Sequence, residues 1–432
     1  MKKSAWLLAI PLACFDCVTP GAEAEHHDGA PFEDPGDARD LHADAAAPVT
    51  TPPPLPVDID AASTTSGGRW EHLNATNPVR WRIAGLGARG FLPKALLGRI
   101  GKNKDLADVQ RASVAAFEQI PKAVIDRHPF SVNRFSPETA ITDLNAFTAV
   151  QYEPAPTRVS YEPGWMDFAR KPGANEKIWF VNYANQSIGG GVLSHGNVQE
   201  ETLVSYAPQI LQFATSVYGP AHDRATHVNG RTRLALGKAT LQLDASGAPV
   251  YFHEESPGRG YATPILFQNA WMAGQSAYQA DPNSNHGTIT RRMFSQPEAP
   301  FVNIISIAAP RQRQDGDSAS QWSIVTLTDL YATAYSGFAA ASILTPENET
   351  LMIVSGLLGA GVFYNHPVAV CAMQILAAEQ VAVDKLILHT QTNNPTSDAT
   401  VKRAQDLLAK AKHHLGKSHF TVSEVIAAVA AQ

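Results

Sequence analysis

The sequence predicts a three-layer α/β domain in which a mixed sheet lies between two layers of helices. Apolar runs of strand length alternate along the chain with longer segments that repeat apolar residues at helical spacing. This alternation is typical of domains whose helices cover a sheet. Glycine-rich segments follow two of the apolar runs, at 189–191 and 356–361. Residues without Cβ allow the backbone to approach a ligand closely, so these loops are candidate binding elements.

Composition limits the function classes that the chain can serve. A chain of 432 residues can bury a large core and form one or two domains. Its formal charge of −6 argues against a surface that neutralises nucleic-acid phosphates in bulk, so we expect no nucleic-acid partner. The cysteines are Cys14, Cys17 and Cys371. They allow neither an internal disulfide framework nor a cysteine-rich zinc site, and we expect no metal and no cofactor.

The N-terminus has the pattern of an export signal. Lys2 and Lys3 form a charged start, Ala5–Phe15 is an apolar run too short to span a membrane, and an A-x-A site ends at Ala24. We therefore expect a signal peptide over 1–24 and a periplasmic or secreted protein without stable membrane insertion. The alternative is a lipoprotein anchored at Cys14, although Pro11 fits that pattern poorly.

The rest of the chain divides by composition. Residues 25–67 are rich in Ala, Pro, Asp, Ser and Thr and predict a disordered acidic linker. Residues 68–150 predict a helical accessory region, 151–395 the main α/β domain, and 396–432 two C-terminal helices. The expected strands are Lys177–Tyr183, a hairpin of Arg231–Leu243 and Pro249–His253, Phe301–Ala308, Leu351–Ser355 and Lys385–His389. The expected helices are Leu106–Val124 (interrupted by Pro121), Gln199–Val217, Asp329–Ile343, Val368–Glu379, Thr400–His414 and Thr421–Ala431.

The segment Trp179–Val204 carries the most specific pattern in the sequence. An apolar run leads to Gly189, Gly190 and Gly191, and Gln199-Glu200-Glu201 follows after a gap of seven residues. The run predicts a strand that delivers the chain to a turn, where backbone N–H groups would face a ligand. Two adjacent carboxylates would then open the following helix beside that ligand.

This combination resembles the signature of the poly(ADP-ribose) glycohydrolase family, whose bacterial branch has an N-F-A-N-like segment before the glycines, as Asn182–Asn185 stands here. Asn303–Pro310 resembles the family's later buried strand. Leu351–Pro367 resembles its second glycine-rich loop: Gly356, Gly359, Gly361 and Phe363 are kept, whereas Leu357, Leu358 and Ala360 replace the family's Ala, Trp and Cys. The resemblance covers roughly 150–395 and is poor over 205–300.

The resemblance implies a macrodomain-like fold and an enzyme that cleaves ribose–ribose O-glycosidic bonds of poly(ADP-ribose) to release ADP-ribose. ADP-ribosylated proteins are the implied partners. Glu201 would be the catalytic acid–base, Glu200 would hold the hydroxyls of the scissile ribose, and Gln199 would brace the pair. The remaining implied contacts are the ribose for Asn185 and Phe363, and the diphosphate for Gly189, Gly190, Gly191, Gly356, Gly359 and Gly361.

Other interpretations of the same residues stay open. One is an ADP-ribose-binding macrodomain without activity, which would have no need of Glu201. Another is a hydrolase of a different ADP-ribosyl conjugate, since 205–300 could reshape the pocket. Adjacent glutamates are usually solvated, the glycines could be simple connections, and Phe363 could be a core residue. His195 is either a substrate contact or a surface loop residue.

Overall fold

The computed structural model describes residues 57–60, 78–83, 93–100, 103–137, 151–185, 188–194, 196, 198–215, 240–243, 249–253, 264–280, 287–295, 299–312, 318–361, 363–390, 396–416 and 419–432. The signal peptide, the Cys14 alternative and most of the expected linker lie outside these residues and stay predictions. His195 also lies outside them. Within the described part of the chain, no helix is both long and apolar enough to cross a membrane.

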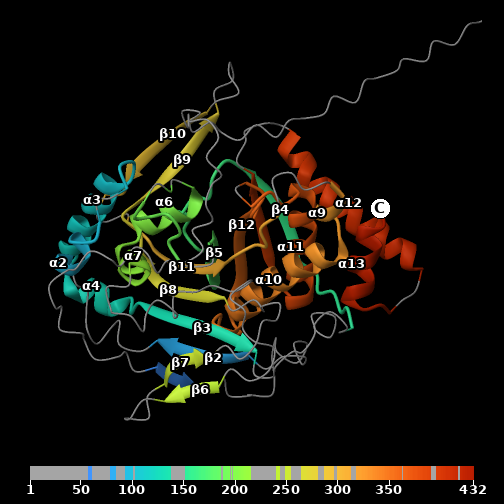
Figure 1. Ribbon diagram of the computed structural model, residues 1–432, viewed down its shortest axis with the longest axis horizontal. Coiled ribbons are helices and arrows are strands. Elements are labelled where there is room, and N and C mark those ends of the chain that lie inside the picture. Colours follow the sequence, from blue (N-terminus) through green and yellow to red (C-terminus); the bar gives the residue numbers. More distant parts are fainter. Residues whose placement is uncertain are drawn as a thin grey trace, which may run out of the picture.

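The centre of the fold is a nine-stranded mixed sheet with the strand order β1-β2-β3-β8-β11-β5-β12-β13-β4 (Figure 1). Neighbouring strands run parallel from β11 to β4 and antiparallel from β1 to β11. The bounds are β1 Val57–Asp60, β2 Pro78–Ile83, β3 Ser131–Pro137, β4 Arg158–Pro163, β5 Glu176–Tyr183, β8 Ile265–Trp271, β11 Phe301–Ile307, β12 Thr350–Gly356 and β13 Lys385–Thr390. The predicted mixed α/β architecture is confirmed.

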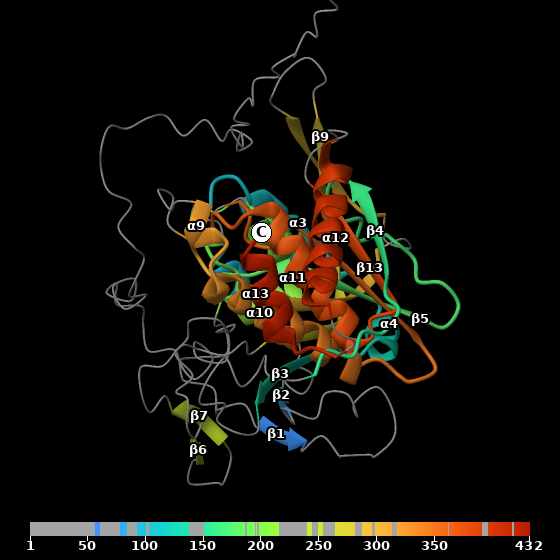
Figure 2. The ribbon, with the colours of Figure 1, turned by 90° about the vertical axis from the view of Figure 1, so that its right-hand side faces the viewer.

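Helices cover both faces of the sheet. Figure 1 shows one group beside β5 and β8 and the other beyond β12, and Figure 2 shows the second group in front of the sheet. The first group is α2 Pro93–Leu97, α3 Ala107–Glu118, α4 Lys122–Arg127, α6 Gln199–Tyr206 and α7 Pro208–Ala214. The second group is α9 Ser318–Gln321, α10 Ile324–Ile343, α11 Pro367–Val381, α12 Thr396–Leu415 and α13 Val422–Ala430.

The two layers form because side chains of a strand point alternately to opposite faces. In β5, Trp179 and Val181 join the core beneath α10 and α11, whereas Ile178 and Phe180 join the core beneath α6 and α7. All four side chains are buried. The continuous apolar run that predicts this strand is therefore explained by helices on both faces.

The main departures from prediction lie at the N-terminus. Residues 57–60, inside the expected linker, form β1, and the expected helical region contains β2 and β3 as well as α2, α3 and α4. Because β3 pairs with β8, this region extends the central sheet instead of forming a separate helical unit. The strands β4, β8, β9 (Gly274–Ala280) and β10 (Gly287–Met293) were not predicted.

Prolines explain two further departures. The single helix expected over 199–217 is divided into α6 and α7, because Pro208 begins the second helix and cannot donate a backbone hydrogen bond to the first. The helix expected over 106–124 ends at Glu118, and Pro121 caps α4. The predicted hairpin is confirmed in its described part, where β6 (Thr240–Leu243) pairs antiparallel with β7 (Pro249–His253).

A glycine in α10 sets how closely this helix approaches the sheet, and Gly337→Ala tests the packing. An added Cβ would lie 2.9 Å from the Cγ2 atoms of both Ile305 and Ile307. Alanine gains about 0.5–1 kcal/mol of helix propensity, but overpacking costs about 1–3 kcal/mol. We expect a net loss of about 1–2 kcal/mol in the free energy of unfolding, measured by urea denaturation. Ser336→Ala is the neighbouring control, and a gain in stability for Gly337→Ala would contradict the close approach.

Candidate active site

The candidate site lies where parallel strands of the sheet end. Strand β5 ends at Tyr183 and β12 ends at Gly356, and the two glycine-rich loops follow these ends. Because β5 and β12 are parallel neighbours, both loops leave the same edge of the sheet. Ligands of open α/β sheets bind outside the carboxyl ends of the strands, so this edge is the expected place for one.

Glu200 lies in the first turn of α6 and is 1% exposed. Its Oε1 accepts hydrogen bonds from the N–H of Gly189 at 2.9 Å and from Nδ2 of Asn182 at 3.3 Å. Its Oε2 accepts from the N–H of Asn185 at 2.6 Å. The carboxyl group is thus held by the end of β5 and by the start of the tri-glycine loop, and the structure brings Glu200, Asn185 and Gly189 together.

Glu201 lies beside it and is 6% exposed. Its Oε1 accepts from the N–H of Gly191 at 3.0 Å, and its Oε2 accepts from the N–H of Val198 at 2.9 Å. The second bond reaches back to the residue before the helix, as in a capping box. A purely capping glutamate at a helix surface stays in contact with water, whereas this one is covered. The solvated interpretation of the glutamate pair is therefore wrong.

The pKa values of both carboxyl groups are raised. For Glu200, burial is the largest cause and the neighbouring charge of Glu201 is the second, and together they raise the pKa from 4.5 to about 8 against three hydrogen bonds that oppose the shift. Burial also raises the pKa of Glu201. Because their charges interact, the two groups titrate as a pair, and with one pKa at about 8 the pair retains a proton at neutral pH.

Glycine is required where the loop covers these carboxyl groups. Gly190 has a φ of +44°, and an added Cβ would lie 2.8 Å from Oε1 of Glu201 and 3.0 Å from Oε2 of Glu200. A Cβ on Gly196 would lie 2.5 Å from Cγ and Cδ of Glu201. The loop is therefore a close-fitting cover and not a simple connection.

One expectation about this loop changes. The glycine N–H groups were expected to face a ligand's diphosphate, but those of Gly189 and Gly191 donate to Glu200 and Glu201. The buried carboxyl oxygens take these donors first because unpaired buried acceptors are costly. In this structure the tri-glycine loop thus orients the carboxyl pair.

Gln199 and Asn182 hold the end of β5 against α6. The side-chain Oε1 of Gln199 accepts from the N–H of Tyr183 at 3.0 Å, and its Nε2 donates to the carbonyl of Val181 at 3.3 Å. Gln199 therefore fixes the strand beside the pair. Buried Asn182 was not predicted as a site residue, although it stands in the segment that carries the resemblance. It donates to Glu200 and also to Oγ of Ser306 at 3.1 Å.

The second loop begins against the end of β5. Gly356, the last residue of β12, leaves no room for a Cβ beside the Tyr183 hydroxyl oxygen and the carbonyl oxygen of His389. Gly359 has a φ of +70° and leaves no room for a Cβ against Ala309. Gly361 is exposed with open space around it, so its glycine is not required by packing.

Phe363, expected to pack on a ribose, is partly buried and also packs against the core on the α10–α11 side of the sheet. Its carbonyl accepts from the N–H of Gln312 at 2.8 Å. Two buried amides hold the loop: Asn365 donates to the carbonyl of Pro310 at 2.7 Å, and Gln374 donates to the carbonyl of Gly356 at 2.8 Å. Neither amide was predicted, since an isolated amide in a sequence carries no signal of its contact.

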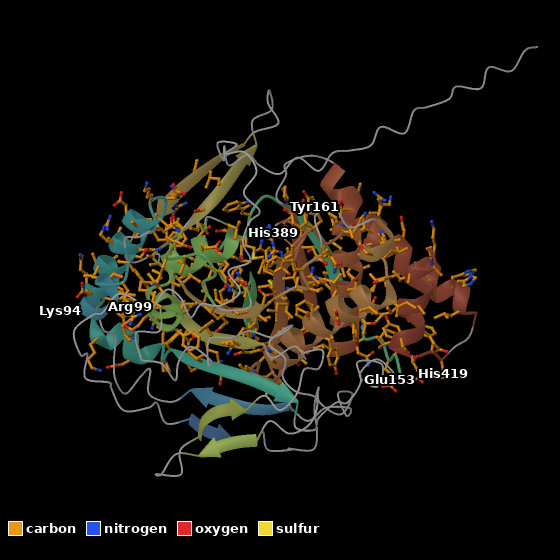
Figure 3. All side chains as sticks on the ribbon, in the orientation of Figure 1. Lys94, Arg99, Glu153, Tyr161, His389 and His419 are labelled. Carbon is orange, nitrogen blue, oxygen red and sulfur yellow. The ribbon has the colours of Figure 1, made fainter. Side chains whose placement is uncertain are left out.

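His389 is a further polar residue at this edge that sequence reasoning missed. Figure 3 shows it near Tyr161, at the ends of β13 and β4. It is buried, and its Nε2 lies 3.6 Å from Oε2 of Glu162, which also pairs with Arg170. Burial lowers the pKa of His389. The neutral imidazole is therefore favoured at the ends of β13 and β4.

Metal ligands are not grouped in the part of the chain that the structure describes: no cluster of three or more His, Cys, Asp or Glu residues there could hold an ion. The chemical groups of the site are thus two protonatable carboxyls, backbone amides and buried side-chain amides. Such groups can donate and accept protons and can orient hydroxyl groups.

Comparison with known proteins gives a distant likeness. No protein-family model matches the chain, and no curated protein matches it. Similar solved structures include two of the poly(ADP-ribose) glycohydrolase of Deinococcus radiodurans in complex with ADP-ribose. One of them, a mutant, is 17% identical with a TM-score of 0.39, and the other structure is 16% identical with a TM-score of 0.37. Each match covers 64% of this chain and 95% of the glycohydrolase chain. The Thermomonospora curvata glycohydrolase is 16% identical over 69% of this chain and 99% of the other, with a TM-score of 0.34. Because these identities and TM-scores are low, the roles of the site residues are argued from their own geometry and chemistry.

Gly190→Ala tests the cover over the carboxyl groups. The substitution places a Cβ against both carboxyl groups and forces a φ of +44°, which costs an L-residue about 1–2 kcal/mol before any clash. We expect the free energy of unfolding, measured by urea denaturation, to fall by at least that amount. Gly173→Ala is the control, because its Cβ meets only ordinary contacts, the nearest at 3.5 Å. Unchanged stability of Gly190→Ala would make the loop a connector.

Glu200→Gln tests the raised pKa through stability. A carboxyl whose pKa is raised on folding stabilises the protein fully below its unfolded pKa and loses that contribution as pH rises through its folded pKa. A shift from 4.5 to about 8 corresponds to roughly 4–5 kcal/mol at ~1.4 kcal/mol per unit. We expect wild-type stability to fall between about pH 5 and 9 and the variant to fall less steeply.

The measurement is denaturant unfolding across that pH range. Glu118→Gln, which changes an exposed carboxyl at the end of α3, should keep the wild-type slope. Because the comparison uses slopes, a constant loss of stability from the mutated hydrogen bonds does not affect it. Parallel slopes for wild type and Glu200→Gln would show that the carboxyl is ionised in the folded protein.

Proposed function

We propose that this chain is a glycohydrolase that cleaves ribose–ribose O-glycosidic bonds of poly(ADP-ribose) and releases ADP-ribose. The observation that carries the proposal is the covered Glu200–Glu201 pair, which keeps a proton at neutral pH at the carboxyl edge of the sheet. Hydrolysis of a glycosidic bond needs a carboxyl group that is protonated at the working pH. The resemblance of the tri-glycine and Q-E-E motif to the glycohydrolase family supplies the substrate class.

Exposure supports different roles for the two glutamates. Each carboxyl group already accepts three hydrogen bonds: Glu200 from Asn182, Asn185 and Gly189, and Glu201 from Gly191, Val198 and its own backbone N–H. Glu201 is the more exposed of the pair, at 6% against 1%. Together with the resemblance of the Q-E-E motif, this supports proton transfer by Glu201 and ribose positioning by Glu200.

In the proposed reaction, Glu201 acts as both the general acid and the general base. Its carboxyl proton passes to the oxygen that links the two riboses as the bond from that oxygen to C1″ breaks, which leaves an oxocarbenium-like sugar. The ionised Glu201 then accepts a proton from the water that attacks C1″, and it is restored to its acid form. The glycine backbone excludes other solvent from the pair, and neither step needs a metal or cofactor.

Two other functions use the same site. An ADP-ribose-binding macrodomain without activity has no need of a buried carboxyl group with a raised pKa at this position, so Glu201 favours the enzyme. A hydrolase that releases ADP-ribose from a protein side chain would use the same carboxyl chemistry. The choice between the polymer and a protein conjugate is therefore a matter for the assay.

Glu201→Gln is the decisive variant. Glutamine keeps the shape and loses the proton, so we expect ADP-ribose release from purified poly(ADP-ribose) to fall by about 10²–10⁴-fold while ADP-ribose still binds. Glu118→Gln is the matched control, because it makes the same change at an exposed position. Substrate arms with polymer and with mono-ADP-ribosylated protein separate the two hydrolases. A wild-type chain that binds ADP-ribose and releases it from neither substrate would be a binding module.

A further inference from the structure

Two buried amide side chains connect the N-terminal region to the loop over Glu201. Helix α3 packs against α6, and Asn103 lies just before it. The Nδ2 of Asn103 donates to the carbonyl of Gly196 at 2.7 Å and to the carbonyl of Gly191 at 3.4 Å. The side chain therefore joins the two ends of the loop that begins at the last of the three glycines. It is fully buried.

Gln110 makes the second connection from within α3. Its Nε2 donates to the carbonyl of Val192 at 2.9 Å and to Oγ of Ser205 at 3.2 Å, and Ser205 stands on α6, one turn beyond Glu201. Gln110 is also fully buried, and its Oε1 has no hydrogen-bond partner. A buried amide with one unsatisfied atom costs about 1–3 kcal/mol, so an apolar residue would serve core packing better.

The loop that these amides hold is the part that covers Glu201. Gly191 donates its N–H to Glu201 at 3.0 Å, and Gly196 packs so closely that a Cβ there would lie 2.5 Å from the carboxyl carbon. Gly196 also donates its N–H to the carbonyl of Gly191 at 3.1 Å. A displacement of Gly191 and Gly196 would remove one hydrogen bond from Glu201 and admit water to it.

We propose that Asn103 and Gln110 are positioning residues that clamp this loop over the Glu201 carboxyl and so keep water away from it. The inference rests on the proposed role of Glu201, and it gives the N-terminal region a function in the site. Release of the clamp would hydrate Glu201. Loss of the Gly191 hydrogen bond would raise the Glu201 pKa, but burial is the larger cause of the shift, so the pKa would fall toward the ordinary value of 4.5.

The charged groups around Glu201 leave burial as the main influence on its pKa. Glu200 is the ionisable group beside it on α6. On the facing helix α3, Asp108 and Arg111 are exposed and pair with each other at 2.8 Å. Exposed pairs of this kind exert little influence on a buried group.

Asn103→Ala and Gln110→Met test the clamp in the full-length chain. The first removes both bonds to the loop, and the second keeps the side-chain length without its amide. Both variants should lose at least tenfold in kcat for polymer cleavage at pH 7.5, with a smaller change in KM. The alkaline limb of the kcat profile should move about one unit to lower pH. Arg111→Ala, a surface change on the same helix, should keep the wild-type profile.

The pH profile of kcat distinguishes a positioning role of Asn103 and Gln110 from a role in the stability of the fold alone. A variant that only destabilises the protein would lower the melting temperature and the amount of active enzyme, but it would leave the alkaline limb in place. If both clamp variants keep the wild-type limb, or if Gln110→Met has wild-type kcat, the positioning role is wrong. Retained activity in the two variants also shows that they fold, so either result is interpretable.

A second readout does not depend on activity. Because Glu201 has a raised pKa, its contribution to stability is lost as pH rises. Asn103→Ala should therefore flatten the fall in stability as pH rises above the ordinary glutamate value of 4.5, and should leave the slope unchanged when Glu201→Gln is already present. Equal slope changes in both backgrounds would overturn the clamp. This double-mutant cycle can succeed even if the chain cleaves no polymer, so failure of the clamp and failure of the proposed function are distinguishable.

Discussion

The site depends on the burial of two adjacent carboxyl groups at the start of one helix. Backbone N–H donors and the N-terminus of α6 favour the ionised forms, and the helix terminus is worth about 0.3–1 kcal/mol per charge at a surface. Removal of a charge from water costs several kcal/mol, and two like charges in contact add to this. Burial therefore prevails, and both pKa values rise. The close glycine cover follows from this arrangement, since no side chain fits above the pair.

The sheet supplies the rigidity that such a pair needs. Strand β5 is buried on both faces, so its end at Tyr183 is fixed by the two cores on either side. Gln199 and Asn182 then join that strand end to α6 through hydrogen bonds. The second loop leaves the next strand, and Gly356 allows the Tyr183 hydroxyl to lie against it. The carboxyl pair is thus held by secondary structure and not by loops alone, which favours precise positioning of a reacting group.

Local sequence patterns predicted the elements that carry local signals. The apolar run of β5, the three glycines and Gln199–Glu201 predicted a strand, a loop and a helix that the structure places together. The N-terminal strands were missed because β2 and β3 owe their place to pairing with distant strands. Asn103 lies 93 residues from Gly196, and no spacing in the sequence marks that bond. The Gly189 and Gly191 N–H groups were predicted to face a ligand, but they donate to Glu200 and Glu201. This was mispredicted because the burial of the glutamates cannot be read from the sequence.

Several features that reduce stability adjoin the carboxyl pair. Glu200 and Glu201 are buried with raised pKa values, and Gln110 leaves an amide oxygen without a partner among the described residues. Gly189 and Gly190 take φ values of +93° and +44°, which other residues adopt only with strain, so the loop needs glycine there. The second loop has costs of its own: Tyr364 takes a φ of 56°, and Asn365 bonds the carbonyl of Pro310 but leaves its Oδ1 without a partner in the described part of the chain. Each cost departs from what stability alone would select, and such departures are expected where a site is maintained for its chemistry. Both loops therefore support the proposed site, and the buried carboxyl pair carries the larger electrostatic cost.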